Sequence, residues 1–513
     1  MKPIRLMTGF FTVGFWTLMS RVLGFVREVL LLSLIGPGPV MDAFVAAFRL
    51  PNMFRRFFAE GAFNAAFVPM FAKRLESGEG ASAFARDAFN GLGLVVLFLT
   101  GLGMVFMPGL VWLTAEGFVG DERFDMTVGY GRIVFPYIVC MSLAALFSGI
   151  LNATGRFAVA AAAPVLLNIC VITAMTIGAL TGGAIINWLI WAIPVAGVAQ
   201  LSLTWWAAAQ AGFPLKPSRP RWNSAMRDMV VIALPAALAS GVMQINLVVG
   251  QLVASQYDSA VSWLFAADRL YQLPLGVVGI AVGVVLLPDL SRRLRGGDDA
   301  GAKTALSRAA EISLALTIPS AVALMVVPFA LVTVLFERGA SDVDDTAAIA
   351  TAVTIYGLGL PAFVLQKVLQ PVYFAREDTR RPFHFAIVAM VVNAALAVGL
   401  TPWVGWIAPA IATTMAGWAM FACLAIGARR YGDAAKFDAR FHKRIWRILL
   451  ASLVMGVALY WTNVTIQPLL GVPWWRGLAL LTLLGVAGLS YFGVGQLIGA
   501  FRLSEFKGAL KRG

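Results

Sequence analysis

The chain has 513 residues, of which 60% are hydrophobic and 13% are charged, and its formal net charge is +14. Soluble domains average about 45–50% apolar and about 25% charged residues. Because a soluble fold cannot bury this much apolar surface, the composition excludes a soluble globular enzyme, a disordered protein and a fibrous protein. It predicts an all-α protein that crosses a membrane many times.

A helix that spans the bilayer needs roughly 20 predominantly apolar residues. Fourteen segments meet this requirement, and their continuous apolar runs favour helices over a β-barrel. The first segment lacks a small-residue cleavage site, so we expect a retained span rather than a signal peptide. The predicted spans are residues 8–35, 40–72, 84–113, 127–153, 158–181, 185–210, 227–254, 259–290, 306–336, 346–374, 382–401, 405–428, 446–466 and 474–500.

The basic residues are distributed unevenly between the two sides of these spans. With the N-terminus in the cytoplasm, most of the 40 Lys and Arg fall on the cytoplasmic side, and only Arg123, Arg132, Arg338 and Arg476 fall outside. Cytoplasmic connections of membrane proteins are enriched in Lys and Arg. We therefore expect both termini in the cytoplasm, and the charge requires no nucleic-acid partner.

The first span carries a polar stripe on an otherwise apolar helix. At about 100° per residue one face collects Gly14, Thr17, Ser20, Arg21, Gly24, Arg27 and Glu28. This pattern favours the wall of a water-filled cavity, and the alternative is a set of internal ion pairs that hold helices together.

In the second span, Leu50-Pro51-Asn52 predicts a break in the helix, because proline lacks the backbone donor and clashes with the preceding turn. Asn52 and Arg55 lie at this break, and Arg55 is favoured as a cavity residue. Arg56 and Glu60 are spaced as an (i, i+4) pair, which favours a purely structural role for them.

Charged residues within the predicted spans are mainly basic. An Arg or Lys at the bilayer centre costs about 2.5–3.5 kcal/mol on insertion scales, so these residues must face one another, water or an anion. Guanidinium groups match phosphate geometry, so the basic excess favours a diphosphate ligand. The residues are Arg21, Arg27, Arg49, Arg55, Arg56, Arg269 and Lys367, against Glu28, Asp42, Glu60 and Asp268.

A weak internal repeat suggests how the spans are grouped. Arg49 and Arg269 precede Pro69 and Pro288 by 20 and 19 residues, and each proline precedes a basic cluster. The repeat predicts two lobes of six spans each, related by an axis along the membrane normal, as in some transporters. The predicted domains are residues 1–215 and 216–431 for the lobes, 432–447 for an interfacial amphipathic linker, and 448–513 for spans 13 and 14 with a basic cytoplasmic tail.

No motif indicates catalysis or a metal. The cysteines Cys140, Cys170 and Cys423 lie in apolar runs without ligand spacing, and no Gly-rich ATP loop occurs. We expect no metal site and no cofactor.

The sequence resembles the bacterial lipid II flippase family (MurJ, formerly MviN), within the multidrug/oligosaccharidyl-lipid/polysaccharide exporter superfamily. The motifs that carry the resemblance are Ser20–Arg27, Asp42–Phe44, Leu50–Asn52 with Arg55–Arg56 and Phe58–Phe63, and Ala267–Leu270. The resemblance implies a transporter, not an enzyme, that moves undecaprenyl-diphosphate-linked peptidoglycan precursor from the inner to the outer leaflet of the bacterial cytoplasmic membrane. It also implies an apolar groove for the lipid tail at spans 13 and 14.

The resemblance implies roles for individual residues. Arg21, Arg27, Arg55 and Arg269 match the cavity arginines of the family, Asp42 matches its essential acidic position, and Glu28 stands where many relatives have Asp. With Asn52 and Glu60 these are the candidate substrate-binding residues. Some relatives bind sodium in the seventh span, whereas Gln244–Gln251 has no carboxylate here, so the coupling ion is left open.

The expected partners are the lipid-linked diphosphate, membrane lipids, and proteins of cell-wall synthesis or division. Three other functions remain open at this stage: a flippase for another lipid-linked oligosaccharide, a drug or cation antiporter of the same superfamily, and a membrane scaffold. An antiporter for cations would need an excess of acid within its spans, which this sequence lacks.

Overall fold

A computed structural model describes residues 6–56, 63–281 and 286–501, and this part of the chain is helical and contains no strand. It forms two compact units, residues 1–262 and 263–513. The first unit contains α1 (Leu6–Leu34), α2 (Pro39–Arg55), α3 (Asn64–Ser77), α4 (Ala81–Val105), α5 (Met107–Thr114), η2 (Glu116–Phe118), α6 (Glu122–Val134), α7 (Tyr137–Ala153), α8 (Phe157–Thr181), α9 (Ile185–Gln210) and α10 (Ser224–Ala254).

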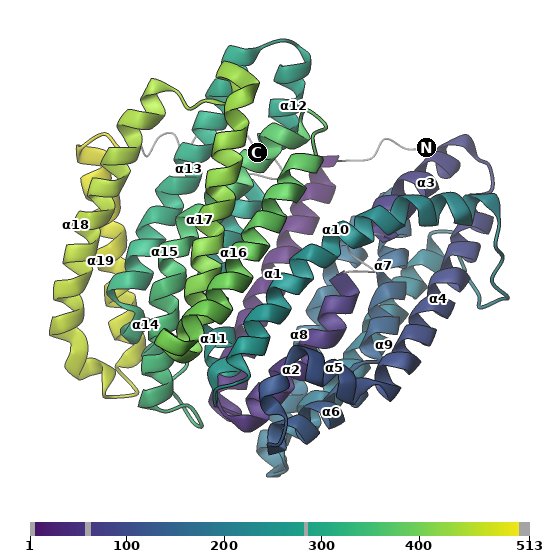
Figure 1. Cartoon of the computed structure of the whole chain (residues 1–513), viewed down its shortest axis with the longest axis horizontal. Coiled ribbons are helices and arrows are strands. Elements are labelled where there is room, and N and C mark those ends of the chain that lie inside the picture. The colour runs from purple at the N-terminus through teal and green to yellow at the C-terminus, as the bar shows by residue number, and fades with distance from the viewer. Residues whose placement is uncertain (1–5, 57–62, 282–285, 502–513) are drawn as a thin grey trace. The chain divides into compact units, whose positions relative to one another are not determined.

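The second unit begins within the first turn of α11 (Ala260–Ala281). Its other helices are α12 (Leu287–Arg295), α13 (Asp299–Val326), α14 (Pro328–Leu335), α15 (Val343–Phe374), α16 (Arg380–Val404), η4 (Gly405–Ile407), α17 (Ala408–Ala428), η5 (Arg429–Ala435), α18 (Ala439–Leu470) and α19 (Arg476–Leu497). Within this unit α18 packs along both α13 and α19 (Figure 1).

Each of the fourteen predicted spans coincides with one helix or with two successive helices. Prolines explain several of the divisions: Pro108 is the second residue of α5, Pro328 is the first residue of α14, and Pro136 directly precedes α7. By length and composition, nine helical stretches of the described residues could cross a membrane, and one of these, Arg380–Ala435, contains both α16 and α17. The all-helical, many-span fold is confirmed, and the count of fourteen remains a prediction.

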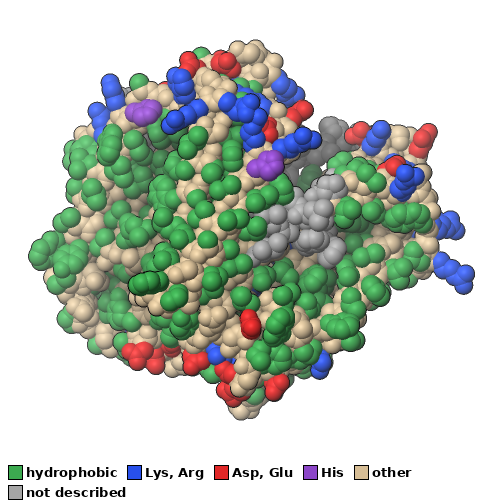
Figure 2. All heavy atoms as spheres, viewed as in Figure 1, with side chains coloured by type: hydrophobic (Ala, Val, Ile, Leu, Met, Phe, Trp, Pro, Cys, Tyr) green, Lys and Arg blue, Asp and Glu red, His purple; other side chains and the backbone are tan. Residues whose placement is uncertain are grey.

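Apolar side chains cover the outward surfaces of the long helices, as a lipid solvent requires. Leu180 on α8 is 82% exposed and Leu489 on α19 is 80% exposed. On the visible face of the second unit, most Lys and Arg gather at one end, where a few Asp and Glu also lie, while the other end carries mainly Asp and Glu and hydrophobic side chains lie between (Figure 2). This distribution suits a bundle that crosses a bilayer.

The compact units divide the chain at a different place from the predicted repeat. The repeat put the boundary after residue 215, whereas α10 packs against α3, α4 and α5 and so belongs to the first compact unit.

Residues 439–447 of the predicted linker are the first turns of α18, so no separate helix forms there. Phe437 stacks on Phe441, with ring centroids 4.3 Å apart.

Candidate functional site

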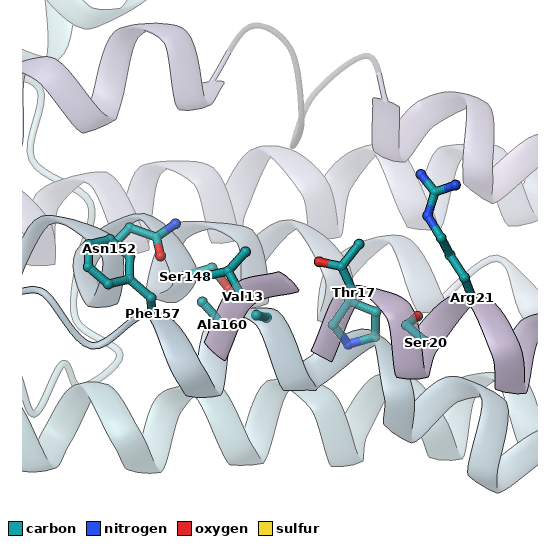
Figure 3. Close-up of a pocket in the computed structure, with 10 residues that line it drawn as sticks. Val13, Thr17, Ser20, Arg21, Ser148, Asn152, Phe157 and Ala160 are labelled. Atoms are coloured by element: carbon teal, nitrogen blue, oxygen red, sulfur yellow. The ribbon is translucent and has the colours of Figure 1, made fainter. Parts of the chain in front are cut away.

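The polar stripe of α1 borders a cavity of about 410 Å³ within the first unit. Figure 3 shows Asn152 and Phe157 at one end of the labelled side chains, Arg21 at the other end, and Thr17 of α1 between them. The polar groups of the wall come from α1 and α7, and the apolar groups mainly from the start of α8. The lining residues are Val13, Thr17, Ser20, Arg21, Ser148, Asn152, Phe157, Ala160, Ala161 and Pro164.

Arg21 carries the charge of this cavity. Its side chain is exposed, and within the described ranges it has no ion-pair partner. Because a solvated guanidinium retains all five donors, Arg21 can bind an anion without first breaking a salt bridge.

Arg27, two turns along from Ser20, lies in a packed part of the stripe. Its guanidinium donates to Glu28 at 2.6 Å and to Oδ1 of Asn168 on α8 at 3.0 Å. The amide of Asn168 in turn donates to the carbonyl of Ser20 at 2.9 Å. Gly24 lies directly beside this contact, since a Cβ there would stand 3.7 Å from the Asn168 amide, an ordinary van der Waals distance. The arrangement holds Arg27 in one orientation beside the cavity.

The predicted break at Leu50-Pro51-Asn52 is wrong, because α2 continues through Pro51 to Arg55. Proline is tolerated within such a helix where neighbouring groups satisfy the freed backbone. Here Pro51 is buried against the rest of the unit, and the amide of Asn52 donates to the carbonyl of Phe48 at 2.9 Å. Asn52 therefore supports its own helix.

Two further candidates lie near the end of α2. Arg55 is half-buried in its last turn and takes part in contacts within the molecule. Glu60, including its predicted pairing with Arg56, lies outside the described residues.

Asp42 lies completely buried in the first turn of α2, where it accepts hydrogen bonds from Ser262. The backbone N–H of Ser262 donates at 2.8 Å and its hydroxyl donates to the same carboxylate oxygen. Nη1 of Arg123 lies 3.6 Å from the other oxygen. Asp42 joins α2 to the start of α11 and does not line the cavity beside Arg21.

Arg123 is a buried residue, although the span pattern placed it in an outer connection. Only 5% of its side chain is exposed, its charge faces Asp121 at 2.6 Å and Asp258 at 3.1 Å, and its guanidinium stands 4.7 Å from the ring centre of Phe118. Burial raises the pKa of Asp121, but the two hydrogen bonds from Arg123 outweigh burial, so this pKa lies below its usual range.

Arg269 lies on α11 in the second unit. Its guanidinium stands 4.5 Å from the ring centre of Phe265, and the neighbouring Asp268 accepts a hydrogen bond from Gln272. The face of an aromatic ring attracts a cation, so this contact stabilises the charged guanidinium.

The first unit therefore brings Arg21 close to the Arg27–Glu28–Asn168 cluster along α1 and α8, while Asp42 belongs to a separate buried network with Arg123. Asn168, Ser148 and Asn152 were not among the predicted residues. Asn168 is a single polar residue in an apolar run, whereas Ser148 and Asn152 stand four apart in one run, and this helical spacing could have indicated a shared polar face. Among the described residues, no group of three or more His, Cys, Asp or Glu could hold a metal ion.

Comparison with known proteins identifies the family. The family model described as "Lipid II flippase MurJ" matches residues 31–475. The "Probable lipid II flippase MurJ" of Rhizobium tropici is 42% identical, over 99% of this chain and 97% of its own length, and that of Rhizobium meliloti (strain 1021) is 43% identical over the same shares.

Solved structures agree with this result. The structure "Lipid II flippase MurJ, inward closed conformation" matches with a TM-score of 0.80 and 26% identity, covering 94% of this chain and 98% of the other. An inward-facing multidrug resistance MATE transporter of the MOP superfamily matches with a TM-score of 0.69 at 16% identity, covering 82% of this chain and 96% of its own, which shows a shared fold alone. The chain therefore belongs to the lipid II flippase MurJ family.

Proposed function

We propose that this multi-pass membrane protein carries lipid II, the undecaprenyl-diphosphate-linked peptidoglycan precursor, from the inner to the outer leaflet of the bacterial cytoplasmic membrane. It is a transporter and not an enzyme. The relatives that are named as probable lipid II flippases support this function, and they match nearly the whole chain. The structural observation that carries it is the cavity on the polar face of α1, with the guanidinium of Arg21 on its wall.

The chemistry of this face suits a diphosphate. Arg21 is solvated, and Arg27 is held by Asn168 and Glu28 beside it. A headgroup diphosphate can accept hydrogen bonds from both guanidinium groups, which are charge-assisted and roughly twice as strong as neutral ones. Arg55, in the last turn of α2 of the same unit, is a further candidate for contact with the anion, and the polyprenyl tail would stay in lipid.

Alternating access gives the headgroup a path that avoids hydrocarbon. In transporters built from parallel repeats, the substrate lies between the lobes near the midplane and the lobes rock around it. Moving one net charge across 100 mV is worth about 2.3 kcal/mol, so the membrane potential can return a cationic empty cavity to its inward-facing state. No cofactor is required for this cycle.

The distribution of basic residues supports an orientation with both termini in the cytoplasm. In this orientation the substrate enters from the side on which the precursor is made. Proteins of cell-wall synthesis or division are the partners that would consume the exported precursor.

A flippase for another lipid-linked oligosaccharide would use the same diphosphate site, so only the headgroup distinguishes the two. A drug or cation antiporter of the same superfamily shares the fold, but the arginines of α1 oppose a cationic substrate.

The test is the leaflet accessibility of the precursor in cells whose only copy of the protein is a variant. Arg27→Ala and Arg269→Ala should leave the precursor inaccessible from outside while the protein still inserts into the membrane. Arg132→Ala is the matched control, since Arg132 is exposed and donates only to the carbonyl of Met104 among the described residues. Normal accessibility with both the Arg27 and the Arg269 variant would reject the proposed function.

A further inference from the structure

We propose that the part of this cavity beyond Arg21, formed by Thr17, Ser148 and Asn152, binds the sugar that is attached to the diphosphate. The inference rests on the proposed function and assigns one part of the substrate to one part of the cavity. The residues concerned lie in the first unit, on α1 and α7.

The hydroxyl groups of this wall are available to a ligand. Elsewhere in the protein many helical Thr and Ser hydroxyls donate to the carbonyl four residues earlier, as Thr100 and Thr204 do at 2.6 and 2.9 Å. Thr17 and Ser148 make no such bond, and in the described part of the chain neither they nor the Asn152 amide has a hydrogen-bond partner. Groups that the fold leaves unused at a cavity wall can donate to and accept from a ligand.

The composition of this part of the cavity fits a neutral, hydroxyl-rich ligand. Apart from Arg21, none of its lining residues is charged. Two hydroxyls and an amide can pair with sugar hydroxyl and acetamido groups, and the ring of Phe157 offers an apolar surface for the C–H face of a sugar ring. The peptide part of the headgroup carries charges, which this lining does not match.

The order of the groups along α1 agrees with the order of groups in the substrate. Thr17 precedes Arg21 by four residues, so their Cα atoms are separated by about 6 Å along the helix axis. Asn152 lies at the far end of the cavity from Arg21 (Figure 3). A diphosphate on Arg21 therefore places the first sugar beside Thr17 and Ser148. The volume, about 410 Å³, lies within the range of small-ligand pockets, about 300–1,000 Å³.

The test compares the binding of two lipids to the full-length protein in nanodiscs: lipid II, and undecaprenyl diphosphate without a sugar. Ser148→Ala and Asn152→Ala should each weaken lipid II binding about 2- to 13-fold, the equivalent of one hydrogen bond of about 0.5–1.5 kcal/mol. Binding of the bare diphosphate lipid should be unchanged, which also shows that the variants are folded. Ser142→Ala is the matched control, since Ser142 lies on the same helix but is buried away from the cavity, and this variant should bind both lipids normally.

Two results would overturn the inference while leaving the proposed function intact. One is unchanged lipid II binding in both variants, and the other is an equal loss for the lipids with and without a sugar. If the wild-type protein bound neither lipid, the proposed function would fail, and this inference with it.

Discussion

The buried contact between Asp42 and Ser262 allows a quantitative prediction. Asp42 is completely buried and accepts two hydrogen bonds from Ser262, while Arg123 stands 3.6 Å away with 5% of its side chain exposed. In Asp42→Ala the N–H and the hydroxyl of Ser262 both lose their acceptor. The buried guanidinium of Arg123 also loses one of its carboxylate neighbours. Removing one partner of a buried charged pair costs about 3–5 kcal/mol, so we expect a loss of this size in the free energy of unfolding.

Asp42→Asn should cost less, about 1–3 kcal/mol, because the amide oxygen can still accept from Ser262 while the charge opposite Arg123 is lost. The assay combines thermal unfolding of the purified protein with hydrogen exchange at the Ser262 amide, which Asp42→Ala should accelerate. Asp344→Ala is the control, since Asp344 is exposed on α15 and a surface change of this kind stays within about 0.5 kcal/mol. Wild-type stability together with unchanged amide exchange in Asp42→Ala would refute the reasoning.

Two further changes test other parts of the structure. The Tyr431 hydroxyl donates to Asp378 at 2.6 Å and holds the pKa of that carboxyl below its usual range. This hydrogen bond therefore stabilises the fold at neutral pH, and its contribution disappears as acidification protonates Asp378. Tyr431→Phe should therefore lower the melting temperature at pH 7 but not at pH 2, and an equal loss at both values would contradict this cause. Gly117→Ala would place a Cβ 2.5 Å from the backbone of Ser255–Gln256, so it should lower the free energy of unfolding by about 1–3 kcal/mol in thermal unfolding. Gly129→Ala is the control, because open space surrounds Gly129 and this variant should not be destabilised. Equal melting temperatures for the two variants would contradict the close approach of the backbones at Gly117.

The positions of the helices follow from the sequence because each span is long and apolar, and this signal is local to the segment. The polar face of α1 was also predictable, since Thr17, Ser20 and Arg21 recur at helical spacing on one side. The continuation of α2 through Pro51 was not predictable in the same way. Whether a proline interrupts a helix depends on the groups packed around it, and these come from distant parts of the chain.

The partners of the charged residues were the least predictable feature. Asn168 contacts Arg27 across 141 residues of sequence, and no periodicity within α8 reveals this contact. Arg123 lies in a predicted outer connection, yet in the fold it is buried and contacts the turn before α11, where it donates to the carbonyl of Tyr257 and pairs with Asp258. Helical periodicity gives the face on which a residue lies, while the helix that covers this face is set by tertiary packing.

The proposed function requires that the arginine-bearing cavity of α1 carry a lipid-linked diphosphate across the bilayer. The most direct measurement is the transbilayer movement of fluorescent lipid II in proteoliposomes that contain only this protein, followed by quenching from one side. With the wild-type protein the quenched fraction should rise beyond the outer-leaflet share, whereas with Arg21→Ala it should stay at that share. Equal movement in wild-type, Arg21→Ala and protein-free vesicles would contradict the claim.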